Sequence, residues 1–335
     1  MNLRPDQLRA ELERGLAPLY VLHGNEPLLV LEAGDAVRAA ARGRGFTERE
    51  TLVSGQGFKW EALFMAAGNI SLFGGAKLID LRIPNGKPGR DGGDALQRYA
   101  RQLDSSNLTL ITLPELDWQT RKTAWFKALD EAGCVVELNA PLREQLPRWL
   151  AERLRRQNQR TDETGLAFIA EHVEGNLLAA HQELQKLGLL YPEGDITLEQ
   201  IQSSVLNVAR YDMDMLRDAM LEGDAARCSR VLEGLRAEGA APPLLLWTLA
   251  AEVRALAYLR AGADAGQPLA GVFKSERIFD ERRKRQLQQA LGRLSRGALN
   301  AALLHAAKLD RVAKGVADGD VWEEFLLLVL RIARP

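Results

Sequence analysis

Apolar residues in the first 140 positions fall in short runs that are separated by amphipathic stretches. The runs are rich in Val, Ile and Leu, a composition typical of strands that are buried in a parallel sheet. The stretches between them repeat apolar residues at spacings of three and four, the period of a helix with one buried face. The pattern predicts strands at 19–23, 50–53, 77–82, 108–113 and 134–138, and helices at 27–42, 60–68, 95–103 and 120–132. Residues 1–140 are therefore expected to form an α/β domain.

Beyond Pro141 the strand pattern disappears and only helical spacing remains. Helices at 143–155, 161–172, 176–188 and 197–208 predict a small helical domain over residues 141–210. Longer helices at 242–261, 281–294, 297–313 and 320–333 predict a third, all-helical domain over residues 211–335, built as a bundle. Within the first domain, the segment NGKPGRDGG at 85–93 is predicted to be a polar loop.

Length and composition agree with several soluble domains. The chain has 335 residues, of which 46% are hydrophobic, enough to fill two or three cores. No apolar run reaches the roughly 18 residues that a membrane-spanning helix needs. The polar N-terminal segment lacks the apolar centre of a secretory signal, so we expect a cytoplasmic protein without a membrane span.

The formal net charge of −1 argues against a protein coated with a nucleic-acid-binding field. The charge is uneven, however, because residues 274–296 hold eight basic and three acidic side chains, a local excess of five. Two interpretations stay open. The stretch is either a solvated helix face with pairs of opposite charge, or a surface that contacts a DNA phosphate backbone through Arg282, Arg283 and Arg285.

A strand, a glycine and a helix follow one another in LYVLHGNEPLLVLEAGDAV, where a nucleotide-binding parallel sheet would place its phosphate loop. Such a loop requires G-x-x-x-x-G-K-[ST], because backbone amides hold the phosphates, the lysine reaches the terminal phosphates and the hydroxyl holds magnesium. Counted from Gly24, the last three positions are Leu29, Val30 and Leu31. Glu26 also adds negative charge where phosphates would lie. The loop is therefore unsuited to phosphate.

At two further positions this sequence also lacks residues that an ATPase uses to bind its nucleotide. The strand at 77–82 contains Asp80 with no acidic neighbour after it, so the acidic pair that would hold magnesium and orient water is absent. In active relatives of this architecture, a helix like EGNLLAAHQELQKL carries an arginine directed at the nucleotide, and that position is Leu178. Three losses at independent places predict a nucleotide-binding fold that holds no nucleotide, and we expect no cofactor.

No catalytic or metal site emerges from the other residue types. The four histidines lack an HExxH or similar spacing, and no G-x-S-x-G elbow is present. Cys134 and Cys228 stand 94 positions apart without a CxxC or Cys/His partner, so we expect buried thiols rather than a disulfide or ligands. We therefore predict no catalytic residues, no metal and no enzyme activity for this chain alone.

Four segments taken in order resemble a known family: GNEPLLVLEAGDAVR, SLFGGAKLIDLR, LPRWLAERLR and EGNLLAAHQELQKLGLLYP. Together, and over nearly the whole chain, they resemble the delta subunit of the bacterial DNA polymerase III clamp loader. The resemblance implies a degenerate AAA+-like (RecA-like) α/β domain, a small helical lid domain and a helical collar domain. The collar would join a circular pentamer with the delta-prime and the gamma or tau subunits.

The resemblance also implies a function in DNA replication. In that family the delta subunit does not hydrolyse ATP, and its neighbours do. It binds the ring-shaped sliding clamp, beta, and stabilises an opened interface, so that the clamp can be placed around primed DNA. The chain would thus be an accessory subunit of a DNA polymerase (nucleotidyltransferase) holoenzyme. The unsuited phosphate loop, acidic pair and lid arginine agree with this assignment.

The family's principal clamp-binding element falls on Ser71, Leu72 and Phe73, and its two apolar anchors match Leu72 and Phe73. Burying a leucine and a phenylalanine in a pocket yields about 1.5 to 3 kcal/mol each, enough to anchor a transient interface. Gly74 and Gly75 would let the chain turn sharply into the next strand. The alternative is that Leu72 and Phe73 belong to the internal core. The resemblance of the surrounding segment to the family favours exposure of the pair on the surface.

Two other hypotheses remain open at this stage. One is a P-loop ATPase with a divergent phosphate site near Gly24. The other is a helical scaffold without a role in replication, for which the basic stretch at 274–296 is only a soluble face.

Overall fold

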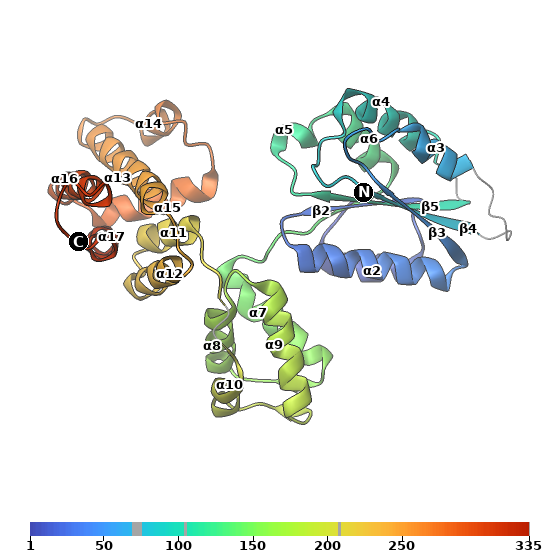
Figure 1. Cartoon of the computed structure of the whole chain (residues 1–335), viewed down its shortest axis with the longest axis horizontal. Coiled ribbons are helices and arrows are strands. Elements are labelled where there is room, and N and C mark those ends of the chain that lie inside the picture. Colours follow the sequence, from blue (N-terminus) through green and yellow to red (C-terminus); the bar gives the residue numbers. More distant parts are fainter. Residues whose placement is uncertain (69–75, 104–105, 207–208, 335) are drawn as a thin grey trace. The chain divides into compact units, whose positions relative to one another are not determined.

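The computed structural model describes residues 1–68, 76–103, 106–206 and 209–334 (Figure 1). The chain forms two compact units, Met1–Asn207 and Val208–Pro335. The boundary between them lies close to the predicted start of the third domain at residue 211. Whether residues 141–210 form a domain separate from residues 1–140 stays a prediction.

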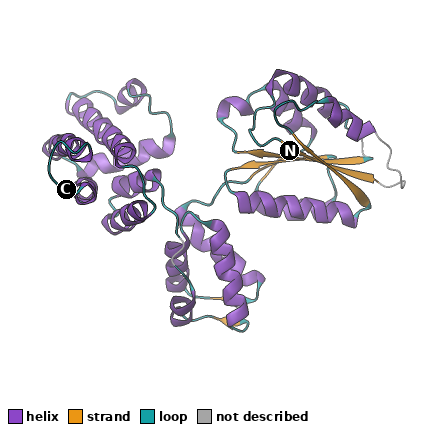
Figure 2. Ribbon diagram, viewed as in Figure 1, coloured by secondary structure: helices purple, strands orange, loops and turns teal. Residues whose placement is uncertain are grey.

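A parallel sheet is the centre of the first unit (Figure 2). Its strands are β1 (Asn2–Leu3), β2 (Leu19–Gly24), β3 (Phe46–Val53), β4 (Ala76–Arg82), β5 (Asn107–Pro114) and β6 (Cys134–Glu137), in the order β1-β6-β2-β5-β4-β3. All five predicted strands are present. The central strand β2 is buried along its whole length, whereas the edge strand β3 alternates between half-buried and exposed residues.

Helices cover both faces of this sheet (Figure 1). One face packs against α1 (Pro5–Arg14) and α2 (Pro27–Gly43), which bury Leu8, Leu12 and Val37. The other face packs against α3 (Glu61–Gly68), α4 (Gly89–Ala100) and α6 (Ala124–Ala132), preceded by the short α5 (Trp118–Arg121). Because all strands of the sheet run parallel, their carboxyl ends lie at one edge, where open α/β sheets bind their ligands.

Helix α4 corrects the predicted loop at 85–93. It begins at Gly89, so the second half of that segment is helical. Gly92 is buried against Trp60. A Cβ atom at this position would lie only 2.4 Å from the indole ring, so no larger residue fits there. The glycines therefore allow close packing of a helix against an aromatic side chain, a task that the composition of the segment alone does not distinguish from loop formation.

The remainder of the first unit is helical. It contains a 3-10 turn at Arg143–Gln145 and helices α7 (Leu146–Arg156), α8 (Glu163–Val173), α9 (Leu177–Leu190) and α10 (Leu198–Ser204). Two short strands, β7 (Gln159–Arg160) and β8 (Gly194–Asp195), pair in parallel and join the loops between these helices. Three helices start at side-chain caps, with Asp162, Asn176 and Thr197 each accepting a backbone N–H of the first turn.

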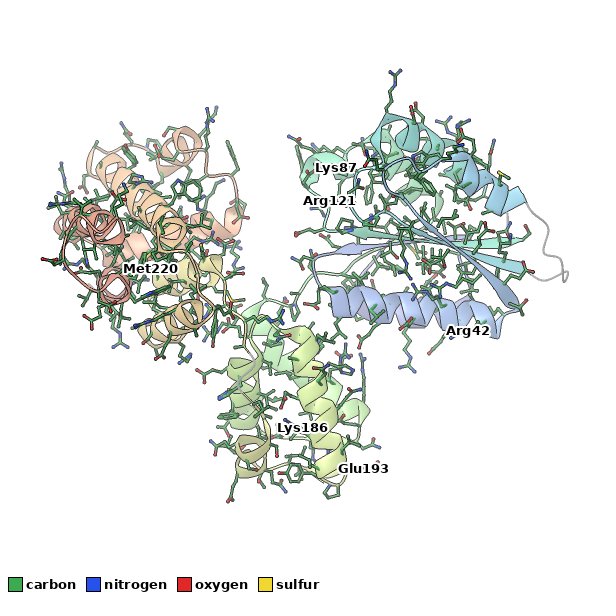
Figure 3. All side chains as sticks on the ribbon, viewed as in Figure 1. Arg42, Lys87, Arg121, Lys186, Glu193 and Met220 are labelled. Carbon is green, nitrogen blue, oxygen red and sulfur yellow. The ribbon has the colours of Figure 1, made fainter. Side chains whose placement is uncertain are left out.

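The second unit is a helical bundle with one continuous core. Its helices are α11 (Met213–Glu222), α12 (Ala225–Ala237), α13 (Pro242–Asp264), α14 (Leu269–Ser275), α15 (Glu281–Arg293), α16 (Arg296–Ala313) and α17 (Val321–Ala333). Met220, labelled in Figure 3, is fully buried in this core. Throughout the described ranges, no helix combines the length and the apolar character that crossing a membrane requires.

Candidate functional site

The phosphate-loop position lies between the end of β2 and the start of α2, and its backbone N–H groups are already bonded within the protein. Asn25 N–H donates to Asn139 Oδ1 at 3.1 Å, and Glu26 N–H donates to the Leu138 carbonyl at 3.2 Å. Leu28 N–H donates to Glu26 Oε1 at 3.1 Å, and Pro27 has no N–H. Three of the donors that could hold phosphates in a nucleotide-binding loop are therefore engaged.

Gly24 and Glu26 have structural tasks at this turn. A Cβ atom at Gly24 would lie 2.1 Å from the Leu138 carbonyl oxygen, so the glycine is needed where β2 closely approaches the chain that leaves β6. The Glu26 carboxylate caps the N-terminus of α2, which is where a phosphate would otherwise be bound. Burial raises the pKa of Glu26, and the hydrogen bond from Leu28 partly opposes that shift.

Asp80 on β4 is completely buried and is surrounded by arginines. Its Oδ2 accepts from Arg38 Nε on α2 at 3.1 Å and from Arg49 Nη2 on β3 at 2.5 Å, and its Oδ1 lies 3.7 Å from Arg82 Nε. The carboxylate thus joins a helix to two strands. A magnesium ion would have to displace these guanidinium groups, so the geometry favours a structural role for Asp80.

The helix α9 carries Leu178 at its first turn, half-exposed, where the sequence predicted a lost arginine. A different arginine reaches α2 from this helical part of the unit. Arg153 on α7 donates through both terminal nitrogens to the carboxylate of Glu32, and its guanidinium lies 4.4 Å from the ring of Trp149. Sequence analysis missed this pair, because the two residues are separated by 121 positions and neither belongs to a motif.

The clamp-binding prediction, Ser71, Leu72 and Phe73, lies outside the described residues. The flanking elements end at Gly68 in α3 and resume at Ala76 in β4. On α3, Met65 has an exposed side chain.

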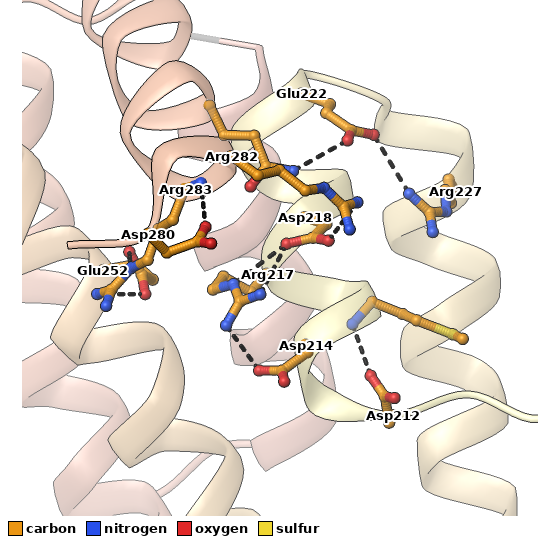
Figure 4. A network of polar contacts seen from close by, with 12 residues as sticks. Asp212, Asp214, Arg217, Asp218, Glu222, Arg227, Glu252, Asp280, Arg282 and Arg283 are labelled. Carbon is orange, nitrogen blue, oxygen red and sulfur yellow. Dashed lines mark hydrogen bonds and ion pairs between the residues drawn. The ribbon is translucent and has the colours of Figure 1, made fainter. Parts of the chain in front are cut away.

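The three predicted DNA-facing arginines all belong to α15 but have different surroundings. Figure 4 shows two of them, Arg282 and Arg283. Arg282 donates to Asp218 on α11 at 2.9 Å. Arg283 forms an ion pair of 2.7 Å with Glu252 on α13. Arg282 and Arg285 are both exposed, whereas Arg283 is half-buried. The structure therefore does not bring the three side chains together on one open face.

Glu252 explains why Arg283 is held inward. Its carboxylate is almost completely buried in the bundle, and burial raises its pKa, whereas the charges of Arg283 and Arg217 lower it. Arg217 also pairs with Asp214 and Asp218 on its own helix (Figure 4). The network ties α11, α13 and α15 together, and loss of one arginine would leave a buried carboxylate without its partner.

Arg285 lines a cleft of about 460 Å³ between α14 and the start of α15. The cleft floor is apolar and includes Phe273 and Ile278. Lys274 and Lys284 add two further cations, and Lys284 is paired with Glu281 at 2.6 Å. Phe279 also lines it, with 69% of its surface exposed. An exposed aromatic ring beside cationic side chains suits a stacked base next to its phosphate.

Comparison with known proteins identifies the family. The sequence model described as "DNA polymerase III, delta subunit" matches residues 20–139, and "Processivity clamp loader gamma complex DNA pol III C-term" matches residues 214–334. The DNA polymerase III subunit delta of Escherichia coli is 33% identical over 97% of this chain and 94% of its own length. The chain belongs to the DNA polymerase III delta subunit family. The clamp-loader and replication class predicted from the four segments is thereby confirmed.

Other members of the delta subunit family agree. The DNA polymerase III subunit delta of Haemophilus influenzae is 29% identical over 98% of both chains. Among solved structures, the Bacillus subtilis DNA clamp loader delta protein superimposes with a TM-score of 0.53 at 15% identity, covering 98% of this chain and 99% of that one. That likeness supports the fold, and the predicted architecture, a parallel-sheet α/β domain followed by helices, is confirmed.

The two cysteines and the potential metal ligands of this delta-family chain can also be placed in the structure. Cys134 and Cys228 are both free and buried, as predicted, and burial raises the pKa of the Cys228 thiol to about 12. Within the described ranges, no three His, Cys, Asp or Glu side chains converge as a metal site would require. The amides of Asn25 and Glu26 in the phosphate-loop position donate to residues 139 and 138. No local sequence pattern predicts these hydrogen bonds.

Proposed function

We propose that this chain binds and opens the sliding clamp beta for loading onto primed DNA, without binding or hydrolysing ATP, in a cytoplasmic complex with delta-prime and gamma or tau subunits. The observation that carries the non-ATPase part is the engagement of the phosphate-loop amides by Asn139, Leu138 and Glu26. An anion would have to break these bonds and approach the Glu26 carboxylate. The arginine-bound Asp80 supports the same conclusion.

A nucleotide titration of the full chain tests this part. We expect no saturable heat with ATP and magnesium up to millimolar concentrations, because the Asn25, Glu26 and Leu28 amides are engaged and the loop lacks the lysine and hydroxyl of a phosphate site. An ATP-hydrolysing gamma subunit under the same conditions is the positive control. Tight, magnesium-dependent binding would instead favour the alternative, a P-loop ATPase with a divergent site.

The clamp contact is assigned to Ser71, Leu72 and Phe73, with Leu72 and Phe73 as the apolar anchors. The family membership and the matching SLFGG segment support this assignment. Clamp opening then uses binding energy at one subunit interface rather than chemistry in this chain, in agreement with its unsuited nucleotide site.

For DNA, we retain Arg285 as the predicted contact and add its cleft neighbours Lys274 and Phe279. Arg282 and Arg283 are proposed to hold the bundle together, since both are paired with carboxylates on other helices. Besides the Lys284–Glu281 pair, the cleft offers a ring for base stacking and the cations Lys274 and Arg285 for phosphate, the combination found in sequence-independent single-strand binding.

Arginine substitutions on α15 test this division. In the assembled loader, Arg285→Gln should lower the slope of log affinity against log salt by about one for primed DNA, because one phosphate contact is lost. Arg282→Gln, on the same helix, is the matched control and should leave the slope unchanged while lowering the melting temperature. The measurement is fluorescence anisotropy across a salt series. An unchanged slope in Arg285→Gln would return the whole stretch to a solvated face.

A further inference from the structure

Arg153 on α7 links the helical part of the first unit, residues 142–206, to a helix that covers the sheet. Its side chain is only 8% exposed, and both of its terminal nitrogens donate to the carboxylate of Glu32 on α2. The bond from Nη1 to Oε1 measures 2.5 Å. A guanidinium that meets a carboxylate with two parallel bonds fixes the direction of the contact as well as its length. The pair therefore fixes how α7 lies against α2.

Two rings of the helical part shield this guanidinium from water. It lies 4.4 Å from the centre of the Trp149 ring, and its Nη1 lies 3.5 Å from Nδ1 of His181 on α9. Burial lowers the pKa of His181, and the charge of Arg153 lowers it further, so the imidazole is neutral at pH 7. Neither ring carries a negative charge. The charge of the buried guanidinium is compensated by Glu32.

Movement of α7 away from α2 would separate Arg153 from this carboxylate. Trp149 and His181 belong to the helical part and would move with the guanidinium, which would stay covered without its partner. Loss of one partner from a buried pair is strongly destabilising, because the desolvated charge has no compensation. The Arg153–Glu32 pair thus resists a change in the orientation of the helical part, and the packing of α9 against α2 supports it.

The link is formed by residues of the chain itself. In active ATPases of this architecture, the helix that corresponds to α9 carries an arginine directed at the nucleotide, so its position depends on the nucleotide. Here that position is Leu178, with 51% of its surface exposed. The arginine that leaves the helical part comes from α7 and ends on a carboxylate of α2. The charge pairing is complete without a phosphate.

We propose that the Arg153–Glu32 pair is a permanent clasp, which holds the helical part of the first unit on α2 in one orientation whether or not a nucleotide is present. This goes beyond the proposed function, which concerns the clamp, DNA and the lack of ATP binding and hydrolysis. The clasp takes over the orienting task that a nucleotide has in ATPases. The first unit then meets its partners as one rigid body rather than as two parts that respond to ATP.

A distance measurement between α2 and α9 tests the clasp. The full chain carries spin labels at Ala39→Cys and Gln185→Cys, two exposed positions, and double electron–electron resonance gives the distance distribution. We expect one narrow distribution that millimolar ATP with magnesium leaves unchanged. Arg153→Met should broaden it by about twofold or more, because the carboxylate loses its partner. Arg156→Met is the matched control on the same helix. It breaks an exposed pair with Glu152 and should leave the distribution unchanged.

Exchange of the two charges separates the ion pair from mere packing of the arginine. Glu32→Arg and Arg153→Glu each place like charges opposite one another, so each should broaden the distribution. The double variant restores opposite charges and should narrow it again. Glu32→Gln leaves the Arg153 side chain and its ring contacts in place, and it replaces Arg153→Met if circular dichroism shows that the latter does not fold. It should broaden the distribution as well.

Three outcomes would overturn the inference: a parental distribution in the folded Arg153→Met or Glu32→Gln variant, a folded charge-exchange variant as broad as the single variants, or a parent whose distribution shifts with ATP. Clamp binding and ATP titration of the parent report on the proposed function independently. If the parent fails to bind the clamp, or binds ATP without a change in distance, the corresponding part of the proposed function fails and the clasp stands.

Discussion

Replacing both Leu72 and Phe73 by alanine is expected to weaken clamp binding by about two to four orders of magnitude. Each side chain contributes about 1.5 to 3 kcal/mol when it is fully buried in a partner's pocket, so the pair supplies about 3 to 6 kcal/mol. Interfaces concentrate their energy in a few apolar and aromatic anchors, which is why two residues suffice for so large a loss. The measurement is surface plasmon resonance of the full chain on immobilised clamp.

A second pair of exposed apolar residues provides the control. Leu31 on α2 and Trp118 on α5 are both more than half exposed in the same unit, and the double variant Leu31→Ala, Trp118→Ala should bind the clamp like the parent. Thermal unfolding shows whether Leu72 and Phe73 are exposed for binding or packed in the core. If Leu72→Ala, Phe73→Ala melts many degrees below the parent, the pair belongs to the core. If it melts like the parent but retains clamp affinity, the assignment to SLF is wrong.

The strands were predictable because burial on both faces leaves a strong local signal. β2 and β5 lie in the middle of the sheet, and their continuous apolar runs differ plainly from the amphipathic helices between them. β1 was missed because it has only two residues, and its existence depends on pairing with β6, more than 130 positions away. No periodicity can reveal so short an edge strand.

Charged residues were the least predictable part of both units. The local excess of positive charge at 274–296 was visible in the sequence, but the carboxylates that hold Arg282 and Arg283 come from α11 and α13. A stretch that is basic along the chain is thus partly neutralised in space. Conversely, the missing side chains of the phosphate loop were visible in the sequence, whereas the engaged amides of Asn25 and Glu26 depend on contacts with residues near 138. Whether the loop binds a nucleotide stays a prediction.

Asp80 is likewise paired with charged side chains from other elements. We predict a large loss of stability when it is substituted. Asp80→Asn should lower the free energy of unfolding by about 3 to 5 kcal/mol, because it removes the charge that compensates the largely buried Arg38 and the half-exposed Arg49. In an ATPase, an acidic pair on this strand would hold magnesium instead; here the carboxylate holds arginines. Urea unfolding followed by circular dichroism measures the change.

Asp35→Asn is the matched control, because Asp35 pairs with the same Arg38 at 2.8 Å but is mostly exposed. Exposed pairs contribute about 0 to 1 kcal/mol, so this variant should unfold nearly like the parent. Adding Arg38→Met to Asp80→Asn should recover part of the loss, since an apolar side chain leaves no uncompensated charge beneath α2. If Asp80→Asn instead unfolds like the parent, the arginines do not depend on this carboxylate, and Asp80 would have to be explained by a bound cation after all.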